Sequence, residues 1–309
     1  MADLSVIIVN HNTRELLAAC LASVYASAGG ANAEVIVVDN ASSDGSADAV
    51  RARFPQAQVL AQSENEGFAR GTNRGITASR GRLVVLLNSD TLILGDALGM
   101  LAQFMDSHPE HAVAGPCLLN RDGSVQTSGY LFTTVLDVLW ETLMLTKAFP
   151  GSAIFNRRGL GGQELRSAQD VDWVSGACLV GRRSAFERVG LLDEGFFFYD
   201  VEVDWCQRVK RAGLRVALVP QAQVVHYIGA TYALMRGDIA GPLLSSRLLY
   251  FSKYSGPAGV LAVRMIFAVG MLGRLLLMPV HWLRRRPNAR SDAHYYWRTL
   301  WAALGIGGD

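Results

Sequence analysis

The chain has 309 residues, of which 50% are hydrophobic and 18% are charged. This composition supplies enough apolar side chains for a sizeable core and excludes a disordered or fibrous protein. The charge is uneven, because residues 236–309 hold ten Lys and Arg against three Asp, whereas the rest hold 19 basic against 24 acidic residues. A basic tail of such apolar content fits a membrane surface better than nucleic acid, so we expect no nucleic-acid partner.

The four cysteines are widely spaced and form no Cys-x-x-Cys pair. We therefore expect buried thiols rather than a zinc knuckle or a disulfide framework at Cys20, Cys117, Cys178 and Cys206. The amino terminus has Asp3 almost at once and no basic segment before an apolar run, which argues against a secretory signal. The expected location is the cytoplasmic face of the cell membrane, with peripheral attachment.

Short apolar runs alternate with helical patterns in the first third of the chain, at residues 4–9, 34–38, 59–61 and 83–87. Asn12, with Glu15 three residues on, is expected to cap a helix that carries Leu17, Leu21 and Val24 and ends at Gly29 and Gly30. Apolar strands separated by helices predict an α/β fold with a parallel sheet covered on both faces.

Ligands of such sheets bind at the carboxyl ends of the strands. That rule directs attention to the polar residues that follow three of the runs: Asn10 and His11, Asp39 and Asn40, and Asn88 and Asp90.

The second half of the chain is less regular. Residues 133–170 lack clear periodicity and are expected to form a mobile insertion. We expect this insertion to face the second substrate, the acceptor. Beyond them the pattern predicts a strand through Trp173–Val180, an aromatic run at residues 196–199, a helix carrying Glu202, and a last strand at residues 216–219 that leads to His226.

Helical patterns continue from Gly241 to the end. Residues 261–283 are strongly apolar, but Arg264, Arg274 and His281 interrupt them and three arginines follow directly. A spanning helix needs about 20 apolar residues with few charges, so a helix lying in the membrane interface fits better. A true span and a buried contact with another domain or copy are the alternatives. The expected domains are residues 1–235 and 236–309.

Several strand-end side chains suit a nucleotide diphosphate sugar. Asp39 can accept hydrogen bonds from a base or ribose, and His11 can pack against the base. Asp90 can meet a bridging Mg²⁺ or Mn²⁺, with Asn88 as a neutral oxygen ligand. The plainer interpretation is that the carboxylates are turn residues and His11 is a partly buried histidine without a ligand.

The run 65–75 combines three glycines with Arg70 and Arg74, which suits close backbone approach and pairing with phosphate; a surface helix with solvated charges is the alternative. Glu202 and Asp204 follow the aromatic run, and a carboxylate beside apolar rings suits a general base, although a charged helix face has the same pattern. His226 is either a late metal ligand or an isolated histidine.

Taken together, these strings resemble family 2 of the glycosyltransferases. They are Ser5–Asn12, Val37–Ser46, Asn65–Gly75, Leu86–Thr91, Asp172–Arg183 and Leu191–Gly213, and the resemblance extends over residues 4–255. It implies a GT-A fold, with a Rossmann-like, mainly parallel sheet, and an inverting displacement in which a carboxylate deprotonates the acceptor while a metal stabilises the departing nucleotide diphosphate. By this resemblance Asp39 seats the base, Asp90 binds the metal and His226 completes the metal shell.

On the same strings we expect two further groups of site residues. The residues expected to bind the nucleotide sugar are Asn10, His11, Asp39, Asn65, Arg70, Arg74, Asn88 and Ser89. The residues expected to form the wall for the acceptor and the sugar are Trp173, Gly176, Phe198, Tyr199 and Asp204.

The sequence departs from the family pattern at two places. The metal-binding triplet begins with Asn88 rather than Asp, which leaves Asp90 with the charge. Val201 and Glu202 stand where a Glu-Asp pair is usual. Glu202 is therefore the expected catalytic base, one methylene longer than the usual Asp, and Asp200 is the reserve.

Within the family the chain is most similar to bacterial rhamnosyltransferases that build cell-wall or surface polysaccharide linkers. This implies dTDP-rhamnose as donor and a glycan or polyprenyl-linked acceptor. The alternatives are a UDP-hexose or UDP-N-acetylhexosamine donor, and a membrane-bound scaffold that has lost catalysis. A dinucleotide oxidoreductase is disfavoured because no Gly-x-Gly-x-x-Gly follows the first strand. A homo-oligomer is a further expectation left open.

Overall fold

The computed structural model describes residues 3–27, 33–156, 159–160, 167–227, 240–278 and 289–305. The chain divides into two compact units. The sheet unit comprises residues 1–132, 159–197 and 201–231, and the helical unit comprises residues 133–158, 198–200 and 232–309. The expected boundary after residue 235 therefore misses the segment 133–158, which groups with the C-terminal helices.

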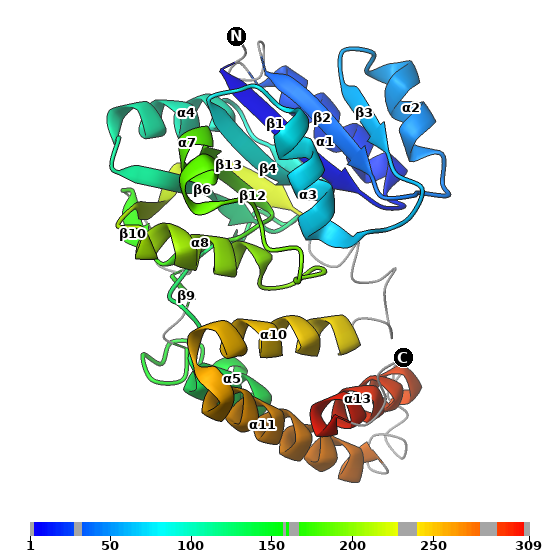
Figure 1. Ribbon diagram of the computed structural model, residues 1–309, viewed down its shortest axis with the longest axis vertical. Coiled ribbons are helices and arrows are strands. Elements are labelled where there is room, and N and C mark those ends of the chain that lie inside the picture. Colours follow the sequence, from blue (N-terminus) through cyan, green and yellow to red (C-terminus); the bar gives the residue numbers. More distant parts are fainter. Residues whose placement is uncertain are drawn as a thin grey trace. The chain divides into compact units, whose positions relative to one another are not determined.

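The described part of the sheet unit holds a ten-stranded sheet in the order β10-β13-β6-β12-β4-β1-β2-β3, with β5 beside β13 and β7 beside β6 (Figure 1). A three-stranded sheet has the order β11-β8-β9. The strands are β1 (Leu4–Asn10), β2 (Glu34–Asp39), β3 (Gln58–Ala61), β4 (Leu83–Asn88), β5 (Thr91–Ile93), β6 (His111–Leu119), β7 (Val125–Gln126), β8 (Gly129–Tyr130), β9 (Gly159–Leu160), β10 (Gln169–Val171), β11 (Trp173–Val174), β12 (Cys178–Arg182) and β13 (Arg215–His226).

The central strands are mainly parallel, as predicted. Strand β1 pairs in parallel with β2 and β4, β2 with β3, and β6 with β13. Strand β12 is antiparallel to both of its neighbours, β4 and β6. The single strand expected over Trp173–Val180 is wrong, because residues 175–177 separate β11 from β12. The last strand is longer than expected and runs directly into His226.

Helices cover both faces of the sheet. They are α1 (Arg14–Ala26), α2 (Ser46–Arg53), α3 (Gly67–Ala78), α4 (Ala97–Ser107), α7 (Arg183–Val189) and α8 (Val201–Arg211). Val6 and Ile8 of β1 belong to the core cluster that includes α1 and α4. Ile7 faces α3, where a Cβ on Gly75 would lie 2.2 Å from its Cγ2. The alternation of β1 side chains between two helical layers explains why the strand is apolar throughout.

The beginning of α1 differs from the expected one. Helix α1 starts at Arg14 with Thr13 at the N-cap position, and no side chain caps it. Asn12 has a φ of 54°, and its side-chain oxygen accepts a hydrogen bond from the Ser43 amide at 2.8 Å. The predicted Asn12 cap is therefore wrong, because this side chain ties two strand-end loops together. Gly29 and Gly30 lie outside the described residues.

The helical unit contains α5 (Val135–Thr142), α6 (Leu145–Ala148), α10 (Ala240–Tyr254), α11 (Gly256–Leu276) and α13 (Ala289–Leu304). Helix α5 starts with a capping box between Thr134 and Asp137, so part of the expected irregular insertion is helical. Helix α11 contacts α5, α10 and α13 (Figure 1). Helix α11 is long and apolar enough to cross a membrane, but length and composition alone are weak evidence of a membrane-spanning helix. His281 and the three consecutive arginines lie outside the described residues.

Candidate active site

Three neighbouring strands end together at one edge of the sheet. In the register of β1 and β2, Asn10 lies opposite Asp39. In the register of β1 and β4, Val9 lies opposite Asn88. The parallel pairing therefore brings the polar residues that follow these strands to a common edge, which is where ligands of α/β sheets bind.

Asp39 is held in one orientation by its neighbours. Its Oδ1 accepts hydrogen bonds from Asn10 Nδ2 at 2.8 Å and from the Ser42 hydroxyl at 2.6 Å. Its Oδ2 accepts the Ser42 backbone N–H at 3.1 Å. Asp39 is 3% exposed and Asn10 is completely buried. Since a carboxylate oxygen has two lone pairs, Oδ2 retains acceptor capacity for an N–H or hydroxyl of a ligand.

A hydroxyl links this carboxylate to the triplet at residues 88–90. The Thr13 Oγ1 donates to Asn10 Oδ1 at 2.6 Å and lies 2.8 Å from the Ser89 hydroxyl. Thr13, Asn10 and Ser89 are all buried. Thr13 was not among the site residues expected from the sequence. Its position three residues after the end of β1 was a weak indication that it lies near the site. The chain of contacts from Asp39 through Asn10 and Thr13 to Ser89 couples the two predicted binding positions.

His11 is also oriented by a loop. Its Nδ1 lies 2.7 Å from the Asn40 carbonyl, and its Nε2 lies 3.3 Å from Asn12 Nδ2. The Asn40 side chain donates to the Gly67 carbonyl at 2.9 Å, while its Oδ1 is buried with no hydrogen-bond partner. The ring is therefore fixed beside the end of β2, and its packing against a base stays a prediction.

Asp90 and His226 meet across the sheet. His226 Nε2 lies 3.5 Å from Asp90 Oδ1, and the Tyr227 amide donates to the Asp90 carbonyl at 2.9 Å. Gln126 Nε2 donates to the His226 carbonyl at 2.8 Å and to Asn120 Oδ1 at 2.9 Å, so its Oε1 is left for His226 Nδ1 at 3.2 Å. This network orients the imidazole, with Nδ1 toward Gln126 and Nε2 toward Asp90, and metal-ligating histidines are commonly held in place by a hydrogen bond of this kind.

This pair fits a divalent cation. A carboxylate oxygen and an imidazole nitrogen are both common ligands of divalent metals, and those of Asp90 and His226 lie 3.5 Å apart. No group of three or more His, Cys, Asp or Glu able to hold a metal occurs within the described ranges. The remaining ligands of such a cation would therefore come from a diphosphate and water, which is the usual way in which Mg²⁺ is bound.

Arg70 and Arg74 lie in a groove along α3. Arg74 pairs with Glu66 at 2.6 Å and Arg70 with Glu194 at 3.3 Å, so both are engaged within the protein. The groove has a volume of about 560 Å³ and is also lined by Gln62. The Gln62 amide donates to the Asp39 carbonyl at 2.9 Å. One wall of the groove thus adjoins the end of β2.

The run 65–75 includes a glycine that allows close packing within the protein. Gly67 has a φ of 86°, and a Cβ there would lie 2.6 Å from the Phe197 carbonyl. Asn65 Oδ1 accepts the Gly67 amide at 3.0 Å, which makes Asn65 part of the turn into α3. The close approach that Gly67 allows is toward the loop at Phe197, and contact of this run with a phosphate stays a prediction.

Glu202 reaches the same edge through the break between β11 and β12. The Asn88 amide donates to the Ala177 carbonyl at 2.9 Å. The Gly176 amide, one residue earlier, donates to Glu202 Oε1 at 3.4 Å. The expected wall residue Gly176 and the expected base Glu202 are therefore in contact, and both are joined to the end of β4.

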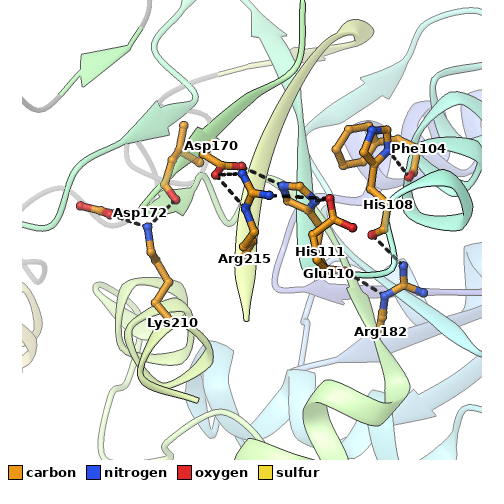
Figure 2. Close-up of polar contacts among 10 residues, drawn as sticks. Phe104, His108, Glu110, His111, Asp170, Asp172, Arg182, Lys210 and Arg215 are labelled. Carbon is orange, nitrogen blue, oxygen red and sulfur yellow. Dashed lines mark hydrogen bonds and ion pairs between the residues drawn. The ribbon is translucent and has the colours of Figure 1, made fainter. Parts of the chain in front are cut away.

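The helix that carries Glu202 is anchored at its other end. Figure 2 shows Lys210 of α8 between two acceptors on the segment from β10 to β11. Its Nζ donates to Asp172 Oδ1 at 2.7 Å and to the Val171 carbonyl at 3.2 Å. Asp172 Oδ2 also accepts the Phe132 amide at 2.9 Å. These contacts position the helix relative to the sheet.

Asp204 does not belong to the expected wall. Its side chain is fully buried and pairs with Arg208 at 2.9 Å, one helical turn further on. A buried carboxylate needs such a partner to stay charged, so Asp204 stabilises α8 instead of lining a site. Trp173 stacks on Tyr130 with ring centroids 4.1 Å apart and donates from Nε1 to the Leu131 carbonyl at 3.1 Å.

Phe198, Tyr199 and Asp200 group with the helical unit. The two rings meet edge to face at 4.9 Å. Asp200 is buried, has a φ of 60°, and lies 3.1 Å from Arg247 of α10. The reserve base is therefore engaged in an ion pair that holds the segment on the helices, and Arg247 is a partner that sequence reasoning missed.

A second group of charged side chains lies where β6 and β13 begin (Figure 2). His111 Nε2 lies 2.8 Å from Asp170 Oδ1, and Arg215 also pairs with Asp170. Burial by itself raises the pKa of Asp170, but hydrogen bonds from His111 and Arg215 outweigh burial and hold the pKa below its ordinary value. The parallel pairing of β6 with β13 puts this group at the other end of β13 from His226.

The four cysteines are free and buried, which confirms the prediction. Burial raises the pKa of Cys20 and of Cys206 to about 12, and it also raises the pKa of Cys117 and Cys178. These thiols are therefore packing groups and not nucleophiles.

Comparison with known proteins gives consistent matches. The model of the family described as Glycosyl transferase family 2 matches residues 5–190. The chain is 29% identical over 213 residues to the N-acetylglucosaminyl-diphospho-decaprenol L-rhamnosyltransferase of Mycobacterium tuberculosis, covering 62% of this chain and 66% of the relative. It is 27% identical over 202 residues to the dTDP-rhamnosyl transferase RfbF of Shigella flexneri, covering 64% of this chain and 61% of the relative. The chain thus spans just under two thirds of the length of these relatives.

Among solved structures, the mannosyltransferase PcManGT from Pyrobaculum calidifontis, in complex with GDP-Man and Mn²⁺, has a TM-score of 0.54 at 16% identity and covers 98% of this chain and 86% of its own. At this identity the likeness concerns the fold. It confirms the expected GT-A architecture.

Proposed function

Because this chain belongs to glycosyl transferase family 2, we propose that it transfers a sugar from a nucleotide diphosphate carrier to a glycan or polyprenyl-linked acceptor in cell-wall or surface glycan synthesis. The observation that carries the proposal is the convergence of three parts at one sheet edge. These are the oriented carboxylate of Asp39, the Asp90–His226 pair, and Glu202 joined to the end of β4 through Gly176.

In the proposed site Asp39 and His11 seat the base and ribose, and Asn88 and Ser89 lie beside the diphosphate. Asp90 and His226 would hold Mg²⁺ or Mn²⁺, which supplies positive charge against the diphosphate leaving group. Metal use is supported by the short distance between the Asp90 carboxylate and the His226 imidazole and by the orientation that Gln126 imposes on the ring.

Glu202 is the proposed general base. It accepts the proton of the acceptor hydroxyl as that oxygen bonds to the anomeric carbon and the bond to the nucleotide diphosphate breaks. Its contact with Gly176 supports this role over Asp200, whose carboxylate pairs with Arg247. The reaction is then a single displacement with inversion.

The proposed donor is dTDP-rhamnose, since two similar proteins carry rhamnosyl transfer in their names. The proposed acceptor is lipid-linked, since one of those names includes a diphospho-decaprenol. A lipid-linked acceptor requires an enzyme that works at a membrane, so we place the protein at the cytoplasmic face, attached peripherally.

The test is nucleotide diphosphate release from purified chain with dTDP-rhamnose, UDP-glucose or UDP-N-acetylglucosamine, each with Mg²⁺, Mn²⁺ or a chelator. We expect release from dTDP-rhamnose and only with metal. Release from UDP-sugars alone would contradict the donor, and equal rates with chelator would contradict the metal.

Two variants test the roles of the carboxylates. Asp90→Asn is expected to abolish metal-dependent nucleotide binding, whereas Asp48→Asn, an 88% exposed carboxylate on α2, is the matched control and stays active. Glu202→Gln is expected to lower turnover by about 10²-fold or more while nucleotide affinity is kept. Full turnover of Glu202→Gln would exclude it as the base.

A further inference from the structure

Exposed apolar side chains are concentrated in the helical unit. Of the 18 large hydrophobic residues that are exposed within the described ranges, 13 lie in this unit, which holds 107 of the 309 residues. Soluble monomers rarely expose contiguous apolar surface on this scale unless it binds something. The helical unit therefore presents an interaction surface.

Helix α11 provides the longest part of this surface. Its exposed large side chains are Leu261, Met265, Val269, Leu272 and Leu276, each at least 50% exposed. The spacing of three and four residues places them along one side of the helix. From Leu261 to Leu276 this stripe extends about 22 Å at 1.5 Å per residue. No charged residue between Gly256 and Met278 is exposed.

The two arginines of α11 point into the protein. Arg274 donates to the Thr142 carbonyl of α5 at 2.6 Å and lies over the Tyr296 ring. Arg264 donates to the Ala303 carbonyl of α13 at 3.3 Å. Their positive charges are thus used to join α11 to its neighbours. The two internal arginines, which we expected to disfavour a spanning helix, therefore do not add charge to the exposed stripe of α11.

The segment next to α11 adds a second group of apolar side chains. Helix α5 packs against α11. The exposed large hydrophobic residues among the described residues 133–156 are Leu136, Leu143, Met144, Phe149 and Ile154. The segment 133–158, which we expected to face the acceptor, therefore belongs to the helical unit and adds to its exposed apolar surface.

We propose that the stripe of α11, together with the segment 133–158, docks on an anionic lipid bilayer with α11 lying in the plane of the interface. The net charge of residues 236–309, ten Lys and Arg against three Asp, attracts anionic lipid and repels a second copy of this surface. A span is disfavoured because α11 packs against α10 and α13, which carry the exposed Lys253 and Arg298. The inference deepens the proposed membrane location by naming the surface and its partner.

The test is flotation of the full chain with vesicles of phosphatidylcholine alone or with one quarter phosphatidylglycerol. We expect binding to the anionic vesicles that high salt or alkaline carbonate reverses. The triple variant Leu261→Gln, Val269→Gln, Leu272→Gln should bind at least about tenfold more weakly. Met265→Gln should weaken binding, whereas Met100→Gln, an exposed methionine on α4 of the sheet unit, should not.

Any one of four outcomes overturns the proposal. The wild type does not bind anionic vesicles, the triple variant binds like the wild type, or carbonate fails to extract the protein, which would indicate a span. A wild-type dimer in light scattering that the triple variant turns into a monomer would assign the stripe to a second copy. Nucleotide diphosphate release without lipid is measured in parallel, so loss of vesicle binding with donor cleavage intact separates this inference from the proposed activity.

Discussion

Replacing Thr13 by valine should weaken the binding of nucleotide although Thr13 is not itself one of the residues proposed to bind it. The substitution keeps the shape of the side chain and removes one hydroxyl. That hydroxyl makes two contacts, at 2.6 Å to Asn10 Oδ1 and at 2.8 Å to the Ser89 hydroxyl. Asn10 in turn orients Asp39, so the change is expected to reach the base-binding carboxylate through one intermediate.

The magnitude follows from burial. Asn10 is fully buried and Thr13 is 6% exposed, so the Asn10 oxygen loses its donor in a place that water does not reach. Leaving a buried acceptor unsatisfied costs about 1–3 kcal/mol. If half of that cost appears as misorientation of Asp39, nucleotide affinity falls by about two- to tenfold, since about 1.4 kcal/mol corresponds to a factor of ten.

The assay is calorimetric titration of dTDP into Thr13→Val, Thr13→Ser and wild type with Mg²⁺ or Mn²⁺ present. Thr13→Ser keeps the hydroxyl and should bind like the wild type. Nucleotide affinity is the primary measure because a chain with two compact units need not unfold in one step. Equal affinities for all three proteins, or an equal loss in both variants, would refute the coupling through this hydroxyl.

Three further predictions concern stability and reactivity. The pKa of Asp170 is held below its ordinary value, so its ion pairs stabilise the fold above about pH 4 and are lost as the pH falls further. The thermal midpoint of Asp170→Asn, measured as a function of pH, should therefore fall less steeply below about pH 4 than that of the wild type. Arg208→Met should lower the thermal midpoint, because Arg208 pairs with the buried Asp204 and donates to the carbonyls of Val189, Gly190 and Leu191. A thermal midpoint equal to that of the wild type would contradict this reasoning. Finally, with all four thiols buried and the pKa of Cys20 at about 12, Ellman's reagent should label none in the native protein and four after denaturation; rapid native labelling would show that a thiol is accessible.

The edge of the sheet where the candidate site forms was predictable from local pattern. Apolar runs that end in Asn10, Asp39 and Asn88 need only burial on both faces to become parallel strands, and parallel strands end at one edge. The observed register, Asn10 opposite Asp39 and Val9 opposite Asn88, bears this out. The roles of these residues in binding remain predictions for the assays above.

The contacts that join these residues were not predictable. Thr13 and Ser89 are 76 residues apart, Gln126 and His226 are 100 apart, and Gly176 reaches forward to Glu202. Such hydrogen bonds depend on which strands become neighbours and on where a strand breaks. Asp204 shows the reverse case, because its position after an aromatic run suggested a wall residue and packing buried it completely.

The amino-acid sequence by itself determined the class of fold, the family, and the presence of an apolar helix whose two arginines share one side. Only the tertiary structure decided which way that side points. Arg264 and Arg274 face the carbonyls of Ala303 and Thr142, and the leucines of the opposite side are left uncovered. The physical reason is that helical periodicity sets only the angle between side chains on one helix. Which side of α11 becomes buried depends on the elements that pack against it, including α5, which is more than 100 residues earlier in the sequence.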